Sequence, residues 1–319
     1  MYQNFIGIDI GKDSFVVGQY LAKETIEFDN NLSGFKKFFT HYNNLLPSAF
    51  VVLEATGGYE MCLVKFLISE NINLHRADTR KVKYFIRSFG IQAKTDCIDA
   101  KNLARYAFER HARLECFVPQ SNEQEELQQL VQRRLDLRQM LVQEKNRLQS
   151  PHKNNLLKKT CQYLIDSIKS QMELLETEIE QIIKGTDYEA KQAVLEEIDG
   201  IGKITANTLL ALLPELGTIS GGQVASLVGV APHPCESGKK IGYRRTKGGR
   251  QSVRNILFMS AMTAARSKGR LGEFYRNLIN RDKKKMVALA ALMRKIIVIA
   301  NAKMRDWYNE QKLKMVEQI

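Results

Sequence analysis

The first 118 residues alternate short apolar runs with amphipathic stretches, a pattern that predicts the strands and helices of an α/β domain. Five runs predict strands, at residues 5–9, 14–21, 25–28, 50–53 and 72–75. Ser33 can N-cap a helix with an apolar face, and a second helix is expected through Leu63 and Leu67. A hairpin meander followed by βαβ crossovers is the order that an RNase H-like layer of helices on a mixed sheet requires, and we expect that fold here.

Residues 119–186 carry a heptad pattern instead. In the second half of this region apolar side chains recur alternately every four and three residues, at Cys161, Ile165, Ile168, Met172, Leu175, Ile179 and Ile182. The first half follows the same rule at Leu127, Leu130, Leu137, Leu141 and Leu148, with Arg134 and Glu144 interrupting it. Turn-forming residues at 150–155 separate the halves. We therefore expect a central coiled-coil hairpin of two antiparallel helices, while pairing of the seam between two chains remains an alternative.

Residues 187–319 are expected to form a mainly α C-terminal domain. Long apolar-periodic helices are predicted at 255–265 and 286–307. Near the start of this region Gly200 and Gly202 flank a hydrophobic residue between two predicted helices. This is the pattern of a helix-hairpin-helix element, in which backbone N–H groups bind a phosphate at a helix N-terminus. A plain helix–turn–helix connection is the other interpretation of the same glycines.

The charge of the chain changes this picture, because the net charge of +13 is concentrated in one segment. Between residues 239 and 270 there are ten basic residues and no acid. Such a cluster favours a polyanionic partner, DNA or RNA, over an ordinary solvated surface. We assign nucleic-acid contacts to the first seven of these residues: Lys239, Lys240, Arg244, Arg245, Lys247, Arg250 and Arg254.

Four acids in the first region are candidates for a metal site. Asp9 and Glu54 each end a predicted strand, and Asp96 and Asp99 share one face of a predicted helix. Taken singly, they fit a turn or a solvated helix face. Together they can converge on one cleft, where their charge is balanced best by Mg²⁺ (or Mn²⁺), a hard ion that prefers oxygen ligands. Two such ions stabilise the attacking and leaving oxygens when a phosphodiester is displaced.

Three segments in this order also carry a family resemblance: Gly7-Ile8-Asp9-Ile10-Gly11-Lys12, Glu54-Ala55-Thr56-Gly57-Gly58-Tyr59 and Lys94-Thr95-Asp96-Cys97-Ile98-Asp99-Ala100. They resemble the DEDD transposases of bacterial insertion sequences, the group that includes the Piv DNA invertase. The resemblance implies an N-terminal domain similar to the Holliday-junction resolvase RuvC, over residues 1–118. It also implies a connector at 119–186 and a transposase domain at 187–319.

The resemblance continues into the basic segment and gives one serine a role. The family carries a Ser-Gly motif followed by Gly-Gly-Arg, and Ser237-Gly238 and Gly248-Gly249-Arg250 match it. From its residue type alone, a serine in such a polar loop is structural. The resemblance implies that Ser237 attacks a DNA phosphodiester and forms a covalent phosphoserine link. Ser252 and Ser260 are rival nucleophiles.

Further partners follow from the resemblance alone. It implies donor and target DNA, a structured noncoding RNA that guides recombination, and a homo-oligomer, either a dimer or a tetramer. It also implies a bacterial, cytoplasmic protein associated with the nucleoid. The absence of a long apolar stretch and of a signal-like start agrees with this location, as do five scattered cysteines without a Cys-x-x-Cys pair.

Other functions remain open at this point. A junction-resolvase-like nuclease would hydrolyse DNA at the acidic site, with Ser237 only contacting phosphate, and a DNA invertase would use the same chemistry to reverse a segment. A sugar-kinase-like ATPase would explain Gly7-Ile8-Asp9-Ile10-Gly11, but it requires a second phosphate loop where the chain has heptads and basic helices. A non-catalytic nucleic-acid-binding module is the last alternative.

Overall fold

The computed structural model describes residues 2–90, 95–151, 154–234, 236–238, 240–242 and 244–317. The chain divides into two compact units, Met1–Pro119 and Gln120–Ile319, called here the N-terminal and C-terminal units.

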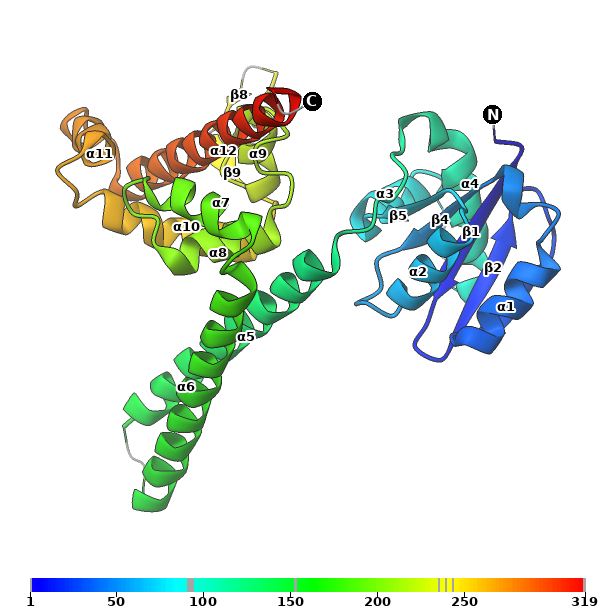
Figure 1. Ribbon diagram of the computed structural model, residues 1–319, viewed down its shortest axis with the longest axis horizontal. Coiled ribbons are helices and arrows are strands. Elements are labelled where there is room, and N and C mark those ends of the chain that lie inside the picture. The colour runs from blue at the N-terminus through cyan, green and yellow to red at the C-terminus, as the bar shows by residue number, and fades with distance from the viewer. Residues whose placement is uncertain are drawn as a thin grey trace. The chain divides into compact units, whose positions relative to one another are not determined.

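The N-terminal unit is built on one mixed sheet of five strands, β1 (Asn4–Ile10), β2 (Ser14–Gln19), β3 (Thr25–Asp29), β4 (Ala49–Glu54) and β5 (Leu74–Ala77). Their order is β3-β2-β1-β4-β5, and Figure 1 labels four of them, β2, β1, β4 and β5. The first three strands form an antiparallel meander, and β4 and β5 run parallel to β1. The predicted mixed α/β unit is thereby confirmed.

Helices cover both faces of this sheet because side chains alternate along each strand. Ile6, Ile8 and Leu53 pack beneath α1 (Leu32–His41) and α2 (Met61–Ser69). Phe5 and Val52 face the other side, with α3 (Thr79–Arg87) and α4 (Asp96–Arg110). Two short 3-10 helices, η1 (Leu46–Ser48) and η2 (His111–Arg113), complete the unit.

Two predicted boundaries in this unit are wrong. The N-cap of α1 is Asn31, whose Oδ1 accepts the Gly34 N–H at 3.0 Å, and Ser33 lies inside the first turn. The last strand begins at Leu74 and not at Ile72. The Ile72 N–H instead donates to the Leu67 carbonyl and closes the end of α2, so it cannot begin a strand ladder.

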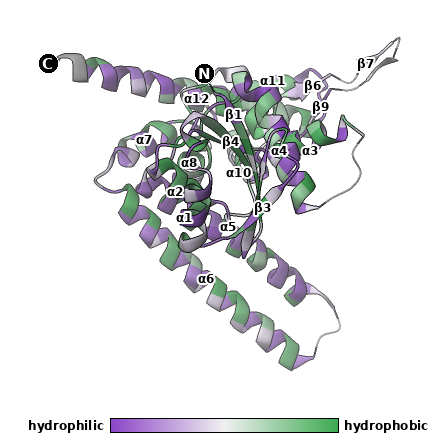
Figure 2. Cartoon of the chain, turned by 90° about the vertical axis from the view of Figure 1, so that its right-hand side faces the viewer, coloured by the Kyte–Doolittle hydropathy of each residue, from purple (hydrophilic) through white to green (hydrophobic). Residues whose placement is uncertain are grey.

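In the C-terminal unit, α5 (Asn122–Gln149) and α6 (Asn155–Ile183) pack on each other as an intrachain hairpin. Figure 2 shows hydrophobic and hydrophilic residues alternating along both helices. Leu137, Leu141, Ile165, Ile168 and Met172 fill the contact. Toward the base of the hairpin Val131 and Ile183 are buried, next to the predicted Leu130 and Ile182. A straight helix of 3.6 residues per turn drifts against a 3.5-residue repeat, so the buried stripe moves to the neighbouring residue.

One of the two interruptions in the seam joins the helices. The Arg134 guanidinium donates to Glu176 Oε1 from Nε at 2.7 Å and from Nη2 at 2.5 Å. The Glu144 side chain is buried and paired with Arg147 on its own helix. An apolar pattern cannot reveal such pairs, because each charge is neutralised by a residue outside the seam.

The remainder of this unit is mostly helical, as predicted. Its helices are α7 (Asp187–Glu196), α8 (Lys203–Leu212), α9 (Gly221–Val228), α10 (Gln251–Ala264), α11 (Arg270–Asn280) and α12 (Lys285–Glu317). They surround one apolar core that includes Leu209, Leu257 and Ile296. Two strand pairs were not predicted, β6 (Pro232–His233) with β9 (Arg245–Thr246) and β7 (Glu236–Ser237) with β8 (Lys240–Ile241). Two-residue strands are too short to show a period of two.

Within the described ranges, none of the helices combines the length and apolar character needed to cross a bilayer.

Candidate functional site

Asp9 and Glu54 lie at the carboxyl ends of two neighbouring parallel strands. The pairing of β1 with β4 runs to Ile8 and Leu53, so the two acids are the next residues in the same register. Each is one residue beyond a side chain that faces α1 and α2, which places both acids on the opposite face, with α3 and α4. Both acids are half-buried.

Helix α4 crosses this face in close contact with β1. A Cβ atom on Gly7 would lie 2.2 Å from the Ala100 carbonyl oxygen, so only glycine permits this approach. The ring of Phe108, near the end of α4, packs on Phe5 with centroids 5.3 Å apart. Ala100 is next to Gly7 and Phe108 is next to Phe5, so the helix advances while the strand goes back. Helix α4 therefore runs antiparallel to β1.

This direction brings the aspartate pair to the same end of the sheet as the strand carboxylates. From Ala100 back to Asp96 the helix rises about 6 Å, and from Gly7 forward to Asp9 the strand advances about 7 Å. Thr95 fixes the start of the helix, because its Oγ1 accepts the Ile98 N–H at 3.3 Å. Asp96 is exposed and Asp99 half-buried. The fold therefore brings all four predicted acids to one edge of one sheet face.

These four carboxylates are hard oxygen donors of the kind that Mg²⁺ or Mn²⁺ prefers, and they lie at the same end of the sheet. Among the described residues, however, no group of three or more His, Cys, Asp or Glu side chains is arranged to hold a metal ion. The backbone brings the four acids to one edge of the sheet, whereas their side chains are not drawn together as ligands.

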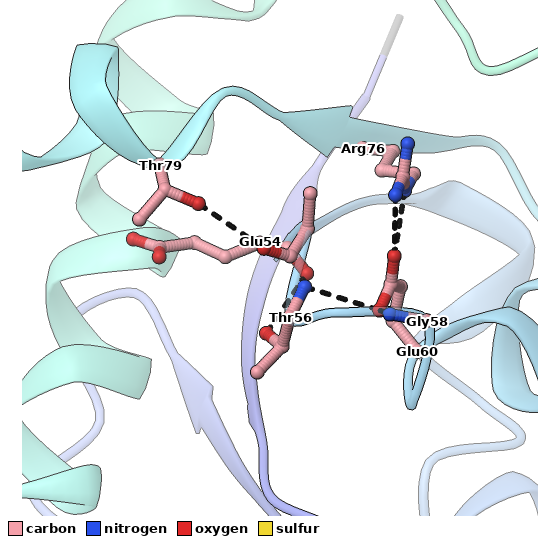
Figure 3. Close-up of polar contacts among 7 residues, drawn as sticks. Glu54, Thr56, Gly58, Glu60, Arg76 and Thr79 are labelled. Atoms are coloured by element: carbon pink, nitrogen blue, oxygen red, sulfur yellow. Dashed lines mark hydrogen bonds and ion pairs between the residues drawn. The ribbon is translucent and has the colours of Figure 1, made fainter. Parts of the chain in front are cut away.

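The segment that follows Glu54 is held by a residue that the sequence analysis missed. The Glu60 side chain is fully buried, and its Oε1 accepts hydrogen bonds from Arg76 Nε at 2.9 Å and Nη2 at 2.6 Å. Its Oε2 accepts the N–H groups of Thr56 and Gly58, both at 3.0 Å. In Figure 3 the Glu54 carboxylate points away from this pair, toward the α4 side of the sheet. Glu60 thus anchors the turn that directly follows Glu54.

Two opposing effects act on the pKa of Glu60. Burial raises the pKa, but the backbone hydrogen bonds and the Arg76 guanidinium lower it by more, so the carboxyl stays ionised. The sequence contains one clue to this arrangement, an acid placed between a glycine turn and an apolar helix. Its partner Arg76, sixteen residues away on strand β5, could not be identified from spacing.

Ser237 lies exposed at the end of β7, at the turn of a hairpin. It pairs with Lys240, and Gly238 between them has φ +56°. His233 lies on β6, which pairs with β9 instead. Of the two rival nucleophiles, Ser260 is buried against Thr205, with the two hydroxyl oxygens 3.1 Å apart. Ser252 is half-buried. Ser237 is therefore the most accessible of the three hydroxyls.

The predicted basic contacts divide into two groups. Arg250 forms a two-point ion pair with Glu215 at 2.6 Å and donates to the Leu212 carbonyl at 2.9 Å. Arg254 donates to the Gly248 carbonyl at 2.8 Å. These two guanidinium groups hold α10 against neighbouring segments.

The other basic side chains of the segment face solvent where the structure describes them. Arg244, Arg245 and Lys247 are exposed. Lys239 lies outside the described residues, and Lys240 is described only by its place in β8. Among the seven predicted contacts, the cations described as exposed are consequently carried by β9 and the residues beside it.

Gly200 and Gly202 lie between α7 and α8, as expected, but they differ in surroundings. A Cβ atom on Gly200, whose φ is +89°, would lie 2.4 Å from the Ser260 carbonyl oxygen of α10. Gly202 is the exposed N-cap of α8 and has open space beside it. Helix packing accounts for Gly200, so only Gly202 is placed to leave room for a ligand.

Comparison with known proteins matches both halves of the chain. Residues 6–159 match the DEDD transposase domain of the IS110 type, and residues 192–276 match the transposase domain of the IS116/IS110/IS902 family. The pilin gene-inverting proteins of Moraxella bovis and Moraxella lacunata are each 29% identical, over 96% of this chain and 97% of theirs. An uncharacterized 44.8 kDa protein of insertion element IS116 from Streptomyces clavuligerus is 27% identical over 40% of this chain and 35% of its own length. Both halves of the chain are thus similar to IS110/IS116/IS902 transposase domains, and these matches indicate a DNA transposase or recombinase.

Proposed function

We propose that this transposase cuts and rejoins DNA strands with two sets of groups, the carboxylates Asp9, Glu54, Asp96 and Asp99 and the hydroxyl of Ser237. The observation that carries the proposal is the antiparallel crossing of α4 over β1, which brings two helical acids level with two strand-end acids. The order β3-β2-β1-β4-β5 supports the RNase H-like, RuvC-like fold that such a site requires.

The acids bind the cation. Mg²⁺ or Mn²⁺ held by the four carboxylates would neutralise charge on the scissile phosphate and polarise its P–O bond. Asp9 and Glu54 hold fixed positions because Glu54 is the last residue of a buried strand and Asp9 the last but one of another. Asp96 and Asp99 lie in the first turn of α4 on a helix held by close backbone packing. The chain therefore supplies hard oxygen donors on firmly held backbone elements.

Ser237 is the nucleophile in this proposal. Its Oγ attacks the phosphorus of a phosphodiester, a serine–phosphate bond forms, and the P–O bond to the neighbouring sugar breaks. The serine proton passes to the departing sugar oxygen, directly or through water. Attack by another sugar hydroxyl on the phosphoserine then rejoins the strand and restores the serine. The bond energy is conserved in the adduct, so strand exchange needs no ATP.

The acids and Ser237 belong to different units, and we propose that the active site is assembled in a dimer or tetramer. The basic residues Arg244, Arg245 and Lys247 would contact DNA phosphates, and a noncoding RNA of the element would select the donor and target. The two pilin gene-inverting relatives favour DNA inversion as a second outcome, reached by the same chemistry on sites in opposite orientation.

The test is a covalent adduct. The full chain is incubated with Mg²⁺ and duplexes that carry the ends of its own element, with and without the transcript of the adjoining noncoding DNA. Denaturing gels then show whether labelled DNA migrates with the protein. We expect an adduct that is lost in Ser237→Ala and kept in the matched control Ser252→Ala, and that Asp9→Asn also abolishes. Cleavage without an adduct would instead identify a hydrolytic, junction-resolvase-like nuclease.

A further inference from the structure

Helix α3 presents a basic face that lies outside the basic segment considered so far. Six of its nine residues are exposed, and four of these are cations: Arg80, Lys81, Lys83 and Arg87. The other two are Thr79 and Tyr84, and the Tyr84 side chain is 72% exposed. The opposite face is apolar, with Val82 and Phe85 buried against the sheet. The helix contains no acid, and the neighbouring Asp78 is used as its N-cap.

This face begins beside the carboxylate edge of the sheet. Thr79, the first residue of α3, donates from Oγ1 to the carbonyl of Ala55 at 3.2 Å, and Ala55 directly follows Glu54 (Figure 3). A hollow of about 390 Å³ lies at the same place, lined by Ala55, Arg76, Ala77, Asp78, Thr79 and Arg80. A strand bound in the hollow would pass directly onto the cations of α3.

We propose that α3 binds the phosphate backbone of the DNA that enters the carboxylate site. A nine-residue helix is about 13.5 Å long, which matches about four base steps at 3.4 Å each. Four cations over this length neutralise consecutive phosphates, and the exposed ring of Tyr84 offers a surface on which a base can stack. This proposal rests on the proposed function, because it takes the bound DNA to be the strand that is cut.

The salt dependence of binding measures these contacts directly. Each neutralised phosphate of duplex DNA contributes about 0.9 to the slope of log K against log salt. Replacing two lysines of α3 in the full chain, Lys81→Gln with Lys83→Gln, is expected to reduce the magnitude of this slope by about 1.8. If affinity at 1 M salt is unchanged, binding at 0.1 M salt weakens about sixtyfold. Fluorescence anisotropy of a labelled duplex without added divalent metal gives both values.

A matched control removes the same charge from the other face of the sheet. Lys36 and Lys37 are exposed on α1, and Lys36→Gln with Lys37→Gln should leave the slope unchanged. The charge-preserving pair Lys81→Arg with Lys83→Arg should bind as the natural protein does, which separates charge from folding. Equal slopes for the α3 and α1 glutamine variants would overturn the proposal.

Two further outcomes are distinguishable. If the α3 glutamine variant loses slope only on the RNA transcript and not on duplex DNA, the assignment to DNA is wrong. If the slope falls on DNA but the unaltered chain forms no covalent adduct, α3 is a DNA-binding face and the proposed function has failed by itself.

Discussion

Replacing Glu60 by glutamine is expected to destabilise the N-terminal unit by about 3 kcal/mol at pH 7. The carboxylate accepts four hydrogen bonds, two from Arg76 and one each from the Thr56 and Gly58 N–H groups. A glutamine side chain has one oxygen, so either the guanidinium or the two amides must face an NH₂ group, whichever way the side chain turns.

The magnitude follows from burial. Removing one partner of a buried ion pair costs about 3–5 kcal/mol. Glu60 is fully buried, but the Arg76 side chain is 35% exposed and water can solvate it in the variant, which places the cost at the lower end of that range.

Glu70→Gln is the matched control. It removes the same charge from an exposed carboxylate at the C-terminal end of α2, and it should cost less than about 0.5 kcal/mol.

The effect depends on pH in a defined direction. The pKa of Glu60 is lowered in the folded protein, against about 4.3 for an unfolded glutamate. The stabilisation is therefore complete above the unfolded value and is lost as the pH falls through the folded value. The difference in unfolding free energy between the natural protein and Glu60→Gln should be full at pH 7 and should shrink below about pH 4.

Two measurements check this expectation. Hydrogen exchange read by mass spectrometry over residues 55–60 reports the Thr56 and Gly58 amides, and urea unfolding followed by circular dichroism gives the free energy. The single tryptophan, Trp307, lies in the C-terminal unit, so its emission monitors that unit as an internal control. If Glu60→Gln and Glu70→Gln unfold within about 0.5 kcal/mol of each other at pH 7, the reasoning about the buried pair is refuted.

Three further tests concern packing and charge. Gly7→Val should cost about 3 kcal/mol by urea unfolding, because its Cβ would collide with the α4 backbone; normal stability would contradict the close crossing. Arg134→Glu should lower the melting temperature of the hairpin, and adding Glu176→Arg should recover about 1 kcal/mol of the free energy of unfolding. A double-mutant cycle with no coupling would show that the pair contributes nothing. Arg250→Ala should lower the free energy of unfolding by about 1.5–3 kcal/mol. Arg245→Ala should leave stability unchanged and reduce the salt dependence of DNA binding. The reverse pattern would contradict the assigned roles.

The division of the basic residues has a consequence for interpreting loss of activity. Loss of DNA binding in Arg250→Ala or Arg254→Ala could come from a displaced α10, because both guanidinium groups hold that helix. Variants of Arg244, Arg245 and Lys247 avoid this ambiguity, since these side chains are exposed. Stability should therefore be measured beside binding for the two engaged arginines.

Local patterns in the sequence were sufficient to predict most helices and strands and to place each candidate acid on a strand or a helix. Short apolar runs predicted the strands that carry Asp9 and Glu54 at or near their carboxyl ends, and heptad spacing predicted the helices of the hairpin. Both patterns follow from the repeat of a single element, which is a property of neighbouring residues. The same reasoning could not detect the two-residue strands around Ser237, because they are shorter than one readable period.

Only the tertiary structure decided which residues meet. The direction of α4 over Gly7, and with it the level of Asp96 and Asp99 against the strand acids, depends on packing between segments about ninety residues apart. The partner of Glu60 and the engagement of Arg250 by Glu215 are likewise long-range contacts between charges that look solvated in the sequence. A charged side chain carries no local signal of its partner, because pairing depends on where the folded backbone places the opposite charge.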